Sequence, residues 1–388
     1  MQSLDESGLL RTLRPPAGID LSSNDYLGLA HDPRIMSAMI AAVAREGVGS
    51  TGSRLLRGER DSFTALEERF ARFKGTERAL YFSSGYLANL AVMTTFADAD
   101  DVIVSDERNH ASLIDGIRLS PARREIVAHN DVAAARRALH AGAGEASEAG
   151  GAGEARRARD AGRAGARFLV VESLFSMDGD EAPLAAYAEI CAATGAYLIV
   201  DEAHAVGVYG ARGTGLIEEH GIADRVFLSV NTAGKALGVS GAFVAGPAWA
   251  IDYLIQRARP FIFSTAAPPA IAAAVEASLD VIEAEPQRRA RLRATAQTLR
   301  ARLQTAGVPA GAGASQIVPI FIGDNDAAVA VAEAMQADGF DVRAVRPPSV
   351  PPGTARLRIC INVNLTGEII DRFVPALVSA LVNAGADL

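Results

Sequence analysis

Polar side chains of several chemical types follow short apolar runs in the first two thirds of the chain. These residues are Gly85 and Tyr86 after RALYF, His110 after VIV, Ser176 after RFLVV, Asp201 and His204 after YLIV, and Thr232 and Lys235 after VFLSV. In open α/β sheets, ligands bind beyond the carboxyl ends of the strands. We therefore predict that a carboxylate, two imidazoles, two hydroxyls, an amine and a phosphate-binding helix N-terminus meet at one sheet edge.

Lysine is rare in this chain, because all but two of the 38 Lys and Arg residues are arginine. Arginine replaces lysine wherever a solvated positive charge suffices, but a guanidinium stays protonated and cannot act as a nucleophilic amine. Lys235 therefore indicates an amine with a chemical function. The other lysine, Lys74, stands directly before Gly75 in a helix C-cap pattern, and we expect it at the surface end of a helix.

Each of these residues alone also fits a structural role, such as a helix cap for Asp201 or a turn hydroxyl for Ser176. Together they match the needs of pyridoxal 5'-phosphate (PLP). This cofactor needs a Schiff-base lysine, a carboxylate that keeps the pyridine nitrogen protonated, a donor to the phenolic oxygen, a ring-stacking group and a phosphate cup. The combination predicts a PLP enzyme.

The apolar runs that precede these residues alternate with helical segments between residues 78 and 245. This alternation predicts an α/β fold with a mostly parallel sheet and helices on both faces. Two long helical stretches follow, near 267–283 and 287–306, and lead into SQIVPIFIG, DVRAV and RLRICIN. The second pattern is typical of a smaller α+β domain at the C-terminus.

These patterns divide the chain into three expected parts: an N-terminal arm (1–30), a large cofactor-binding domain (31–268) and a small C-terminal domain (269–388). The second boundary lies near the paired prolines of AAPPA. Residues 141–166 contain no aromatic or large aliphatic side chain, so we expect a low-complexity surface insertion there.

Composition excludes several classes of protein. The 388 residues are 49% hydrophobic and 22% charged, the balance of a folded enzyme. The net charge of -8 and the lack of a basic stripe argue against a nucleic-acid partner. Cys191 and Cys360 lie in apolar runs and predict buried thiols in a reducing compartment. With no signal peptide and no membrane-spanning apolar run, we expect a cytoplasmic protein.

From about residue 10 to the C-terminus, the chain resembles the α-oxoamine synthases, which are fold-type I PLP transferases. The resemblance rests on SSNDYLGLA, GSTGSRLLRG, NHASLIDG, AHND, FSMDGDEAPL, VDEAHAVGVYG, TAGKALGVSGA, FIFSTAAPP and VRPPSVPPGTARLR. FSMDGD, the DEAH before TxGK, and GTARLR together are highly specific for the superfamily. AHND and VRPPSVPPGTARLR point to its biotin branch.

The resemblance implies roles for the residues that face the cofactor. Lys235 would bind PLP covalently and remove the substrate α-proton, Asp201 would hold the pyridinium, and His204 would hydrogen-bond the phenolic oxygen. His110 would stack on the ring and help to position the substrate. The phosphate and the ring substituents would contact Gly85, Tyr86, Ser176 and Thr232.

It also implies substrate contacts and a shared site. Arg358 would grip the amino-acid carboxylate, and Arg11 and Ser349 fall where the family contacts substrate. Thr265 would reach the phosphate of the neighbouring subunit, so a homodimer with shared active sites is implied.

The biotin branch condenses L-alanine with a pimeloyl thioester, carried by coenzyme A or by acyl carrier protein, and releases CO2. The segment GSTGSRLLRG is also found in sister branches that act on glycine. Glycine C-acetyltransferase and 5-aminolevulinate synthase share every catalytic residue named above and remain alternatives. The side-chain difference between alanine and glycine is one methyl group, worth only ~1 to 3 kcal/mol of discrimination.

Other enzyme classes lack their defining motifs. DEAH after a strand also occurs in nucleotide-dependent motors, but these need G-x-x-x-x-G-K-[ST] upstream, and the two lysines stand in FKGT and AGKAL. No G-x-G-x-x-G follows an early strand, which disfavours a dinucleotide dehydrogenase. The six histidines show no ligand-pair spacing on a helix, so we expect no metal site.

Overall fold

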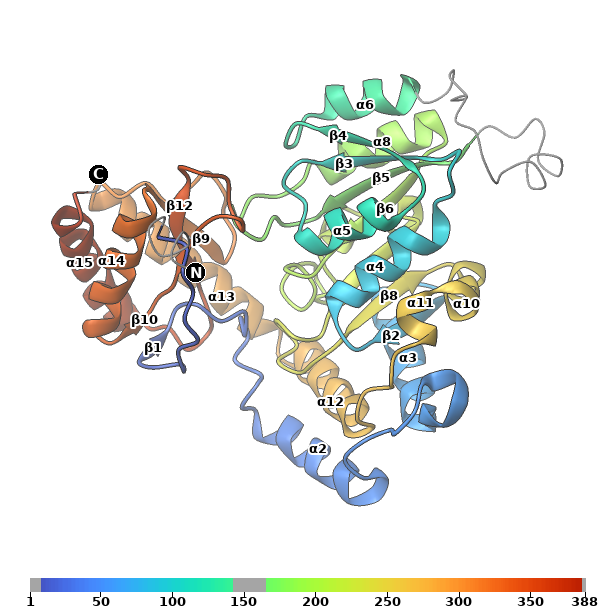
Figure 1. Ribbon diagram of the computed structural model, residues 1–388. Coiled ribbons are helices and arrows are strands. Elements are labelled where there is room, and N and C mark those ends of the chain that lie inside the picture. The colour runs from blue at the N-terminus through green and yellow to red at the C-terminus, as the bar shows by residue number, and fades with distance from the viewer. Residues whose placement is uncertain (1–7, 142–164, 386–388) are drawn as a thin grey trace.

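The computed structural model describes residues 8–141 and 165–385, which form a large and a small lobe (Figure 1). Nearly all of the expected insertion at 141–166 lies outside the described residues. No helix within the described ranges is long and apolar enough to span a membrane.

A mixed sheet of seven strands forms the centre of the large lobe. Its spatial order is β2 (Arg78–Phe82), β8 (Ala242–Gly246), β7 (Leu228–Thr232), β6 (Tyr197–Asp201), β5 (Arg167–Glu172), β3 (Val102–Asp106) and β4 (Arg123–Val127). The strands from β7 to β4 pair in parallel, whereas β8 is antiparallel to both of its neighbours. The prediction of a mostly parallel sheet is confirmed.

Helices cover both faces of this sheet, and each face has its own apolar core. The helices on one face are α4 (Gly85–Phe96), α5 (Ala111–Leu119), α10 (Ala248–Arg257) and α11 (Arg259–Ile262). Those packed on the other are α3 (Asp61–Lys74), α6 (Val132–Ala141), α8 (Leu184–Thr194) and α12 (Ala270–Ala284). Because both faces are covered, the inner strands are mostly apolar rather than alternating, whereas the edge strand β4 is largely exposed.

Short elements complete the large lobe. They are α2 (Pro33–Glu46), which packs along α12, the π-helical turn η1 (Arg54–Gly58), α9 (Leu216–Glu219) and the 3-10 turn η2 (Ala223–Arg225).

The small lobe has an antiparallel sheet of β11 (Ala344–Val345), β12 (Ala355–Cys360) and β9 (Ile317–Gly323). Its helices are α13 (Pro286–Thr305), α14 (Asn325–Ala337) and α15 (Gly367–Asn383), and α13 runs from the large lobe into it (Figure 1). In the N-terminal arm, β1 (Ile19–Asp20) pairs in parallel with β10 (Phe340–Asp341). The arm therefore packs on the small lobe.

The expectation for Lys74 is wrong. It ends α3 before a left-handed Gly75, as the C-cap pattern suggests, but its side chain is buried. Its Nζ donates to Glu202 Oε2 and to the carbonyl oxygen of Thr214, both at 2.5 Å. A buried carboxylate needs a cation beside it, and Glu202 is 128 positions away in the sequence. The local pattern around Lys74 therefore could not show this partner.

Candidate active site

The carboxyl ends of β5, β6 and β7 meet the N-termini of α4 and α5 at an open pocket of about 790 Å³. Six of the predicted residues line it: Gly85, Tyr86, His110, Asp201, Thr232 and Lys235. Parallel strands with covered faces place their last residues at one edge, which explains why residues up to 150 positions apart in the sequence meet there.

Lys235 lies on the loop after β7, with its Nζ 2.8 Å from His204 Nε2. Burial lowers the pKa of Lys235 to about 8, although the carboxylates of Asp201 and Glu172 oppose this shift. Burial also lowers the pKa of His204 well below its usual value, and the charge of Lys235 adds to the effect. The imidazole is therefore neutral, and the lysine reaches its reactive, neutral form near physiological pH.

Asp201 ends β6 and is buried, with a hydrogen-bond donor on each of its carboxylate oxygens. The backbone N–H of Ala203 donates to Oδ1 at 2.8 Å, and Asn89 Nδ2 donates to Oδ2 at 2.7 Å. The same Asn89 nitrogen donates to Ser112 Oγ at 2.9 Å, and Ser112 Oγ lies 2.8 Å from His110 Nδ1. Asn89 therefore connects the carboxylate to the imidazole that caps α5.

The N-terminus of α4 suits an anion. Ser84 caps the helix by accepting the backbone N–H of Leu87, and Gly85 is the first helical residue. A Cβ added to Gly85 would lie 2.6 Å from Thr232 Cγ2, so only glycine allows this close approach. The first backbone N–H groups of the helix have no partner within the helix and can donate to a phosphate.

Two buried oxygen atoms of pocket-lining residues, Glu172 Oε1 and Asn89 Oδ1, have no hydrogen-bond partner among the described residues. Burial raises the pKa of Glu172 to about 8, and the neighbouring Asp201 carboxylate raises it further against the opposing charge of Lys235. Unpartnered polar atoms beside an amine, a carboxylate and an anion-binding helix end fit a bound PLP.

Arg358 reaches this region from β12 of the small lobe and is buried. Its Nη1 donates to Asn24 Oδ1 at 3.0 Å and lies 2.9 Å from Cys360 Sγ, and its Nη2 donates to Tyr26 Oη at 3.4 Å. Its Nε donates to the carbonyl oxygen of Ser176. Within the described ranges, its hydrogen-bond partners are therefore neutral.

Tyr26 connects Arg358 to the lysine, since its Oη also lies 2.7 Å from His204 Nδ1. His204 and Tyr26 thus form a continuous polar chain between Lys235 and Arg358. The groups predicted for covalent cofactor binding and for carboxylate binding lie at the two ends of this chain.

Four other predicted residues do not line the Lys235 pocket. Ser176 is buried behind it, and its backbone N–H donates to Glu172 Oε2 at 3.2 Å. Thr265 does not line the Lys235 pocket but lines a small neighbouring one after α11, which shares Ser83 with it. Arg11 lines a groove against α14 and donates to the carbonyl oxygen of Pro347 at 3.2 Å. Ser349 is exposed, and its N–H donates to the carbonyl oxygen of Arg346 at 3.1 Å.

Three residues of the site were missed in the sequence: Asn89, Glu172 and Tyr26. Asn89 is a polar residue inside the apolar helix α4, one turn after Gly85, and that position is the signal that could have revealed it. Glu172 directly follows RFLVV and is the register partner of Asp201, but an acid after a strand commonly serves as a cap. Tyr26 stands in SSNDYLGLA, among residues that suggest only a turn.

The aminotransferase class I and II family model matches residues 16–377. The 8-amino-7-oxononanoate synthase of Anaeromyxobacter dehalogenans (strain 2CP-1) is 42% identical over 394 residues, which cover 98% of this chain and 94% of the relative. The enzyme of the same name from Bordetella petrii is 44% identical over 361 residues and covers 92% and 86%.

Solved structures agree with these relatives. The serine palmitoyltransferase of Sphingomonas wittichii has a TM-score of 0.86 at 30% identity and covers 95% of this chain and 88% of its own. The 8-amino-7-oxononanoate synthase of Francisella tularensis has a TM-score of 0.76 at 28% identity, covering 94% and 98%.

The fold and site define a fold-type I, PLP-dependent enzyme, and the chain belongs to the aminotransferase class I and II family. Within that family it belongs with the 8-amino-7-oxononanoate synthases, so it is a PLP-dependent acyltransferase. The resemblance seen in the sequence is confirmed, and so is the predicted cofactor.

Proposed function

We propose that the protein condenses L-alanine with a pimeloyl thioester to give 8-amino-7-oxononanoate, CO2 and the free thiol carrier, which is coenzyme A or acyl carrier protein. The name shared by the relatives supports this reaction. The strongest structural support for this reaction comes from Arg358. Its buried guanidinium has neutral partners among the described residues and is connected through Tyr26 and His204 to Lys235. A guanidinium in this setting suits a small substrate carboxylate.

Bound PLP supplies an electron sink for a carbanion at the substrate Cα. The side chains divide the remaining work. Arg358 binds the alanine carboxylate and fixes the Cα near Lys235. The Lys235 Nζ, neutral above its lowered pKa of about 8, accepts the α-proton. Asp201, held by Asn89 and Ala203, keeps a proton on the pyridine nitrogen by stabilising its charged form.

The alanine Cα then forms a bond with the thioester carbon, and the thiolate leaves. The carboxylate of the resulting β-keto acid is lost as CO2, and its bonding electrons return to the Cα, which takes a proton from the Lys235 ammonium. Lys235 thus takes one proton and returns one in each cycle, so its position must stay fixed. The contact of its Nζ with the neutral His204 supports that requirement.

Other parts of the proposal concern contacts outside the pocket. We infer that Thr265 serves the phosphate site of a second subunit in a homodimer, since it lies outside the pocket of its own chain. Arg11 and Ser349 are proposed as substrate contacts, as the resemblance implies. The domain limits at residues 30 and 268 remain predictions. A cytoplasmic location is supported by two free, buried cysteines.

The product of the reaction tests this proposal. The holoenzyme is incubated with L-alanine or glycine and a panel of acyl thioesters, and the ketone is identified by mass. We expect 8-amino-7-oxononanoate from alanine and pimeloyl thioester, and no turnover by Lys235→Arg, which keeps the charge but loses the nucleophilic amine. A glycine-derived ketone as the main product would assign the protein to a sister reaction, and turnover by Lys235→Arg would refute the role of the lysine.

A further inference from the structure

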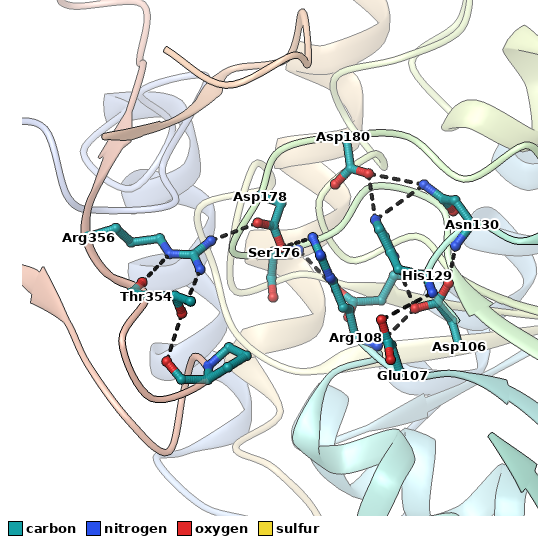
Figure 2. A network of polar contacts seen from close by, with 12 residues as sticks. Asp106, Glu107, Arg108, His129, Asn130, Ser176, Asp178, Asp180, Thr354 and Arg356 are labelled. Atoms are coloured by element: carbon teal, nitrogen blue, oxygen red, sulfur yellow. Dashed lines mark hydrogen bonds and ion pairs between the residues drawn. The ribbon is translucent and has the colours of Figure 1, made fainter. Parts of the chain in front are cut away.

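The AHND segment contains a histidine outside the site described so far. His129 follows β4, and its ring lies between two carboxylates (Figure 2). Its Nδ1 lies 3.0 Å from Oδ1 of Asp106 at the end of β3, and its Nε2 lies 2.7 Å from Oδ2 of Asp180. Asn130 supports both contacts, because its N–H donates to Asp106 Oδ2 at 2.8 Å and its Nδ2 donates to Asp180 Oδ2 at 3.0 Å.

The histidine in this bridge is a cation at neutral pH. Burial lowers the pKa of His129, but its hydrogen bonds and charge interactions with Asp106 and Asp180 outweigh burial and raise the pKa to about 9. Its side chain is only 12% exposed. An imidazolium with a carboxylate on each nitrogen makes two charge-assisted hydrogen bonds, which are stronger and more directional than neutral ones.

Asp180 is the last residue of the segment Phe175–Asp180, which also accepts hydrogen bonds from the small lobe. Asp178 accepts from Arg356 Nη1 on β12 at 2.7 Å (Figure 2). The carbonyl oxygen of Gly179 accepts from Ser315 Oγ at 2.6 Å. The ring of Phe175 packs edge-on against His129, with centroids 4.4 Å apart. The segment is therefore fixed between the end of the large sheet and the small lobe.

The same segment carries the acceptor that orients Arg358. The carbonyl oxygen of Ser176 accepts from Arg358 Nε, and the Ser176 N–H donates to Glu172 in the pocket. A displacement of this peptide would turn the guanidinium away from the Cα position beside Lys235. Misplacement of a binding group by about 1 Å is enough to lower the efficiency of an enzyme strongly.

We propose that His129 is a positioning residue for the amino-acid substrate: by bridging Asp106 and Asp180 it fixes the Phe175–Asp180 segment, whose Ser176 carbonyl aims Arg358. This inference rests on the proposed function, in which Arg358 binds the alanine carboxylate. It assigns a purpose to AHND, a motif that contributes no side chain to the pocket itself.

Binding of alanine to the holoenzyme, without acyl donor, tests the inference. The Kd is measured from the change in visible absorbance on titration with L-alanine, for His129→Gln, Asp180→Asn and the double variant. We expect each single substitution to raise the Kd for alanine about tenfold, as for loss of one charge-assisted contact. In a separate assay with the acyl donor, kcat at saturating alanine should stay within about twofold of the wild-type value. Because His129 and Asp180 act through the same contact, the double variant should bind alanine no more weakly than either single variant.

Two controls separate the possible failures. His220→Gln removes another histidine beside a carboxylate, Glu181, at 3.8 Å, and should leave the Kd unchanged. Arg358→Lys should raise the Kd at least as much as His129→Gln. An unchanged Kd in Arg358→Lys contradicts the proposed function. A raised Kd in Arg358→Lys with an unchanged Kd in Asp180→Asn, or additive effects in the double variant, overturns the role of His129. Asp180→Asn keeps the side-chain shape, so it decides the question even if His129→Gln does not fold.

Discussion

Asn89 contacts more of the catalytic groups than its place in an apolar helix suggests. One amide nitrogen donates to Asp201 and to Ser112, which contacts His110. The amide oxygen is buried without a partner among the described residues and lines the pocket. The carboxylate proposed to contact the cofactor nitrogen and the imidazole proposed to stack on the cofactor ring are therefore both connected to Asn89.

We predict that Asn89→Ala slows exchange of the alanine α-proton with solvent about tenfold, because Asp201 loses one of its two donors. Asp201→Asn should slow the same exchange by ~10^3 or more, since the charge itself is lost. Both rates are measured by NMR in deuterated buffer without acyl donor. Asn231→Ala is the matched control, because Asn231 is also buried but donates to Ser229. Equal exchange rates in Asn89→Ala and the wild type would contradict the prediction.

The residues that could be predicted are those whose type is unusual for their position. Lys235 is one of two lysines, and Asp201 and His204 interrupt a strongly apolar stretch. Glu172 and Tyr26 could not be singled out, because an acid after a strand and a tyrosine in a turn are ordinary. Their importance comes from partners in the fold, Asp201 for Glu172 and Arg358 for Tyr26, that no local pattern contains.

Among the elements, all seven strands of the large sheet start within two residues of an apolar run in the sequence, because strands covered on both faces are rich in apolar residues. The expected run VFLSV begins at residue 226, whereas β7 is Leu228–Thr232, so the strand extends to one of the predicted hydroxyls. The antiparallel direction of β8 could not be predicted, since its apolar run at residues 241–245 (GAFVA) has the same character whichever way the strand runs.

The bridge between β3, β4 and the Phe175–Asp180 segment makes stability depend on pH. The pKa of His129 is raised from 6.5 to about 9 in the folded protein, where its imidazole contacts Asp106 and Asp180. The Glu107 carboxylate is also nearby and accepts the backbone N–H of His129. Its contribution is therefore fully present below pH 6.5 and is lost as the pH rises through about 9. A rise of this size in the pKa corresponds to roughly 3 kcal/mol for a largely buried group.

We predict that the difference in Tm between wild type and His129→Gln is largest near about pH 6 and disappears near about pH 10. Thermal unfolding of the two holoproteins across this range, followed by circular dichroism, measures it. A difference in Tm that stays constant with pH would show that His129 is not charged in the folded protein.

At the scale of the whole molecule, the site needs both lobes. The large lobe provides Lys235, Asp201 and the N-terminus of α4, whereas Arg358 comes from β12 of the small lobe. Thr265 lies outside this combined site, in a small pocket with Ser83 and Arg54. In the proposed homodimer this threonine completes the site of the second subunit.

Complementation between subunits tests that arrangement. We predict that Lys235→Ala is inactive and that Thr265→Val binds PLP more weakly. Refolding an equal mixture of the two should restore about a quarter of the wild-type sites, since half of the dimers are mixed and each holds one intact site. Specific activity at limiting PLP measures this recovery, with each variant refolded alone as the control. No gain on mixing would place Thr265 and Lys235 in the same subunit's site.

The pairing of β1 with β10 joins Ile19 to Phe340, residues that are far apart in the sequence. During translation, the first segment must wait for more than three hundred further residues before its partner leaves the ribosome. The large sheet, complete at Gly246, can assemble well before that moment. Emergence of Arg358 on β12 and capture of β1 thus follow completion of the large sheet, so the residue proposed to bind the substrate carboxylate becomes available after Lys235 and Asp201.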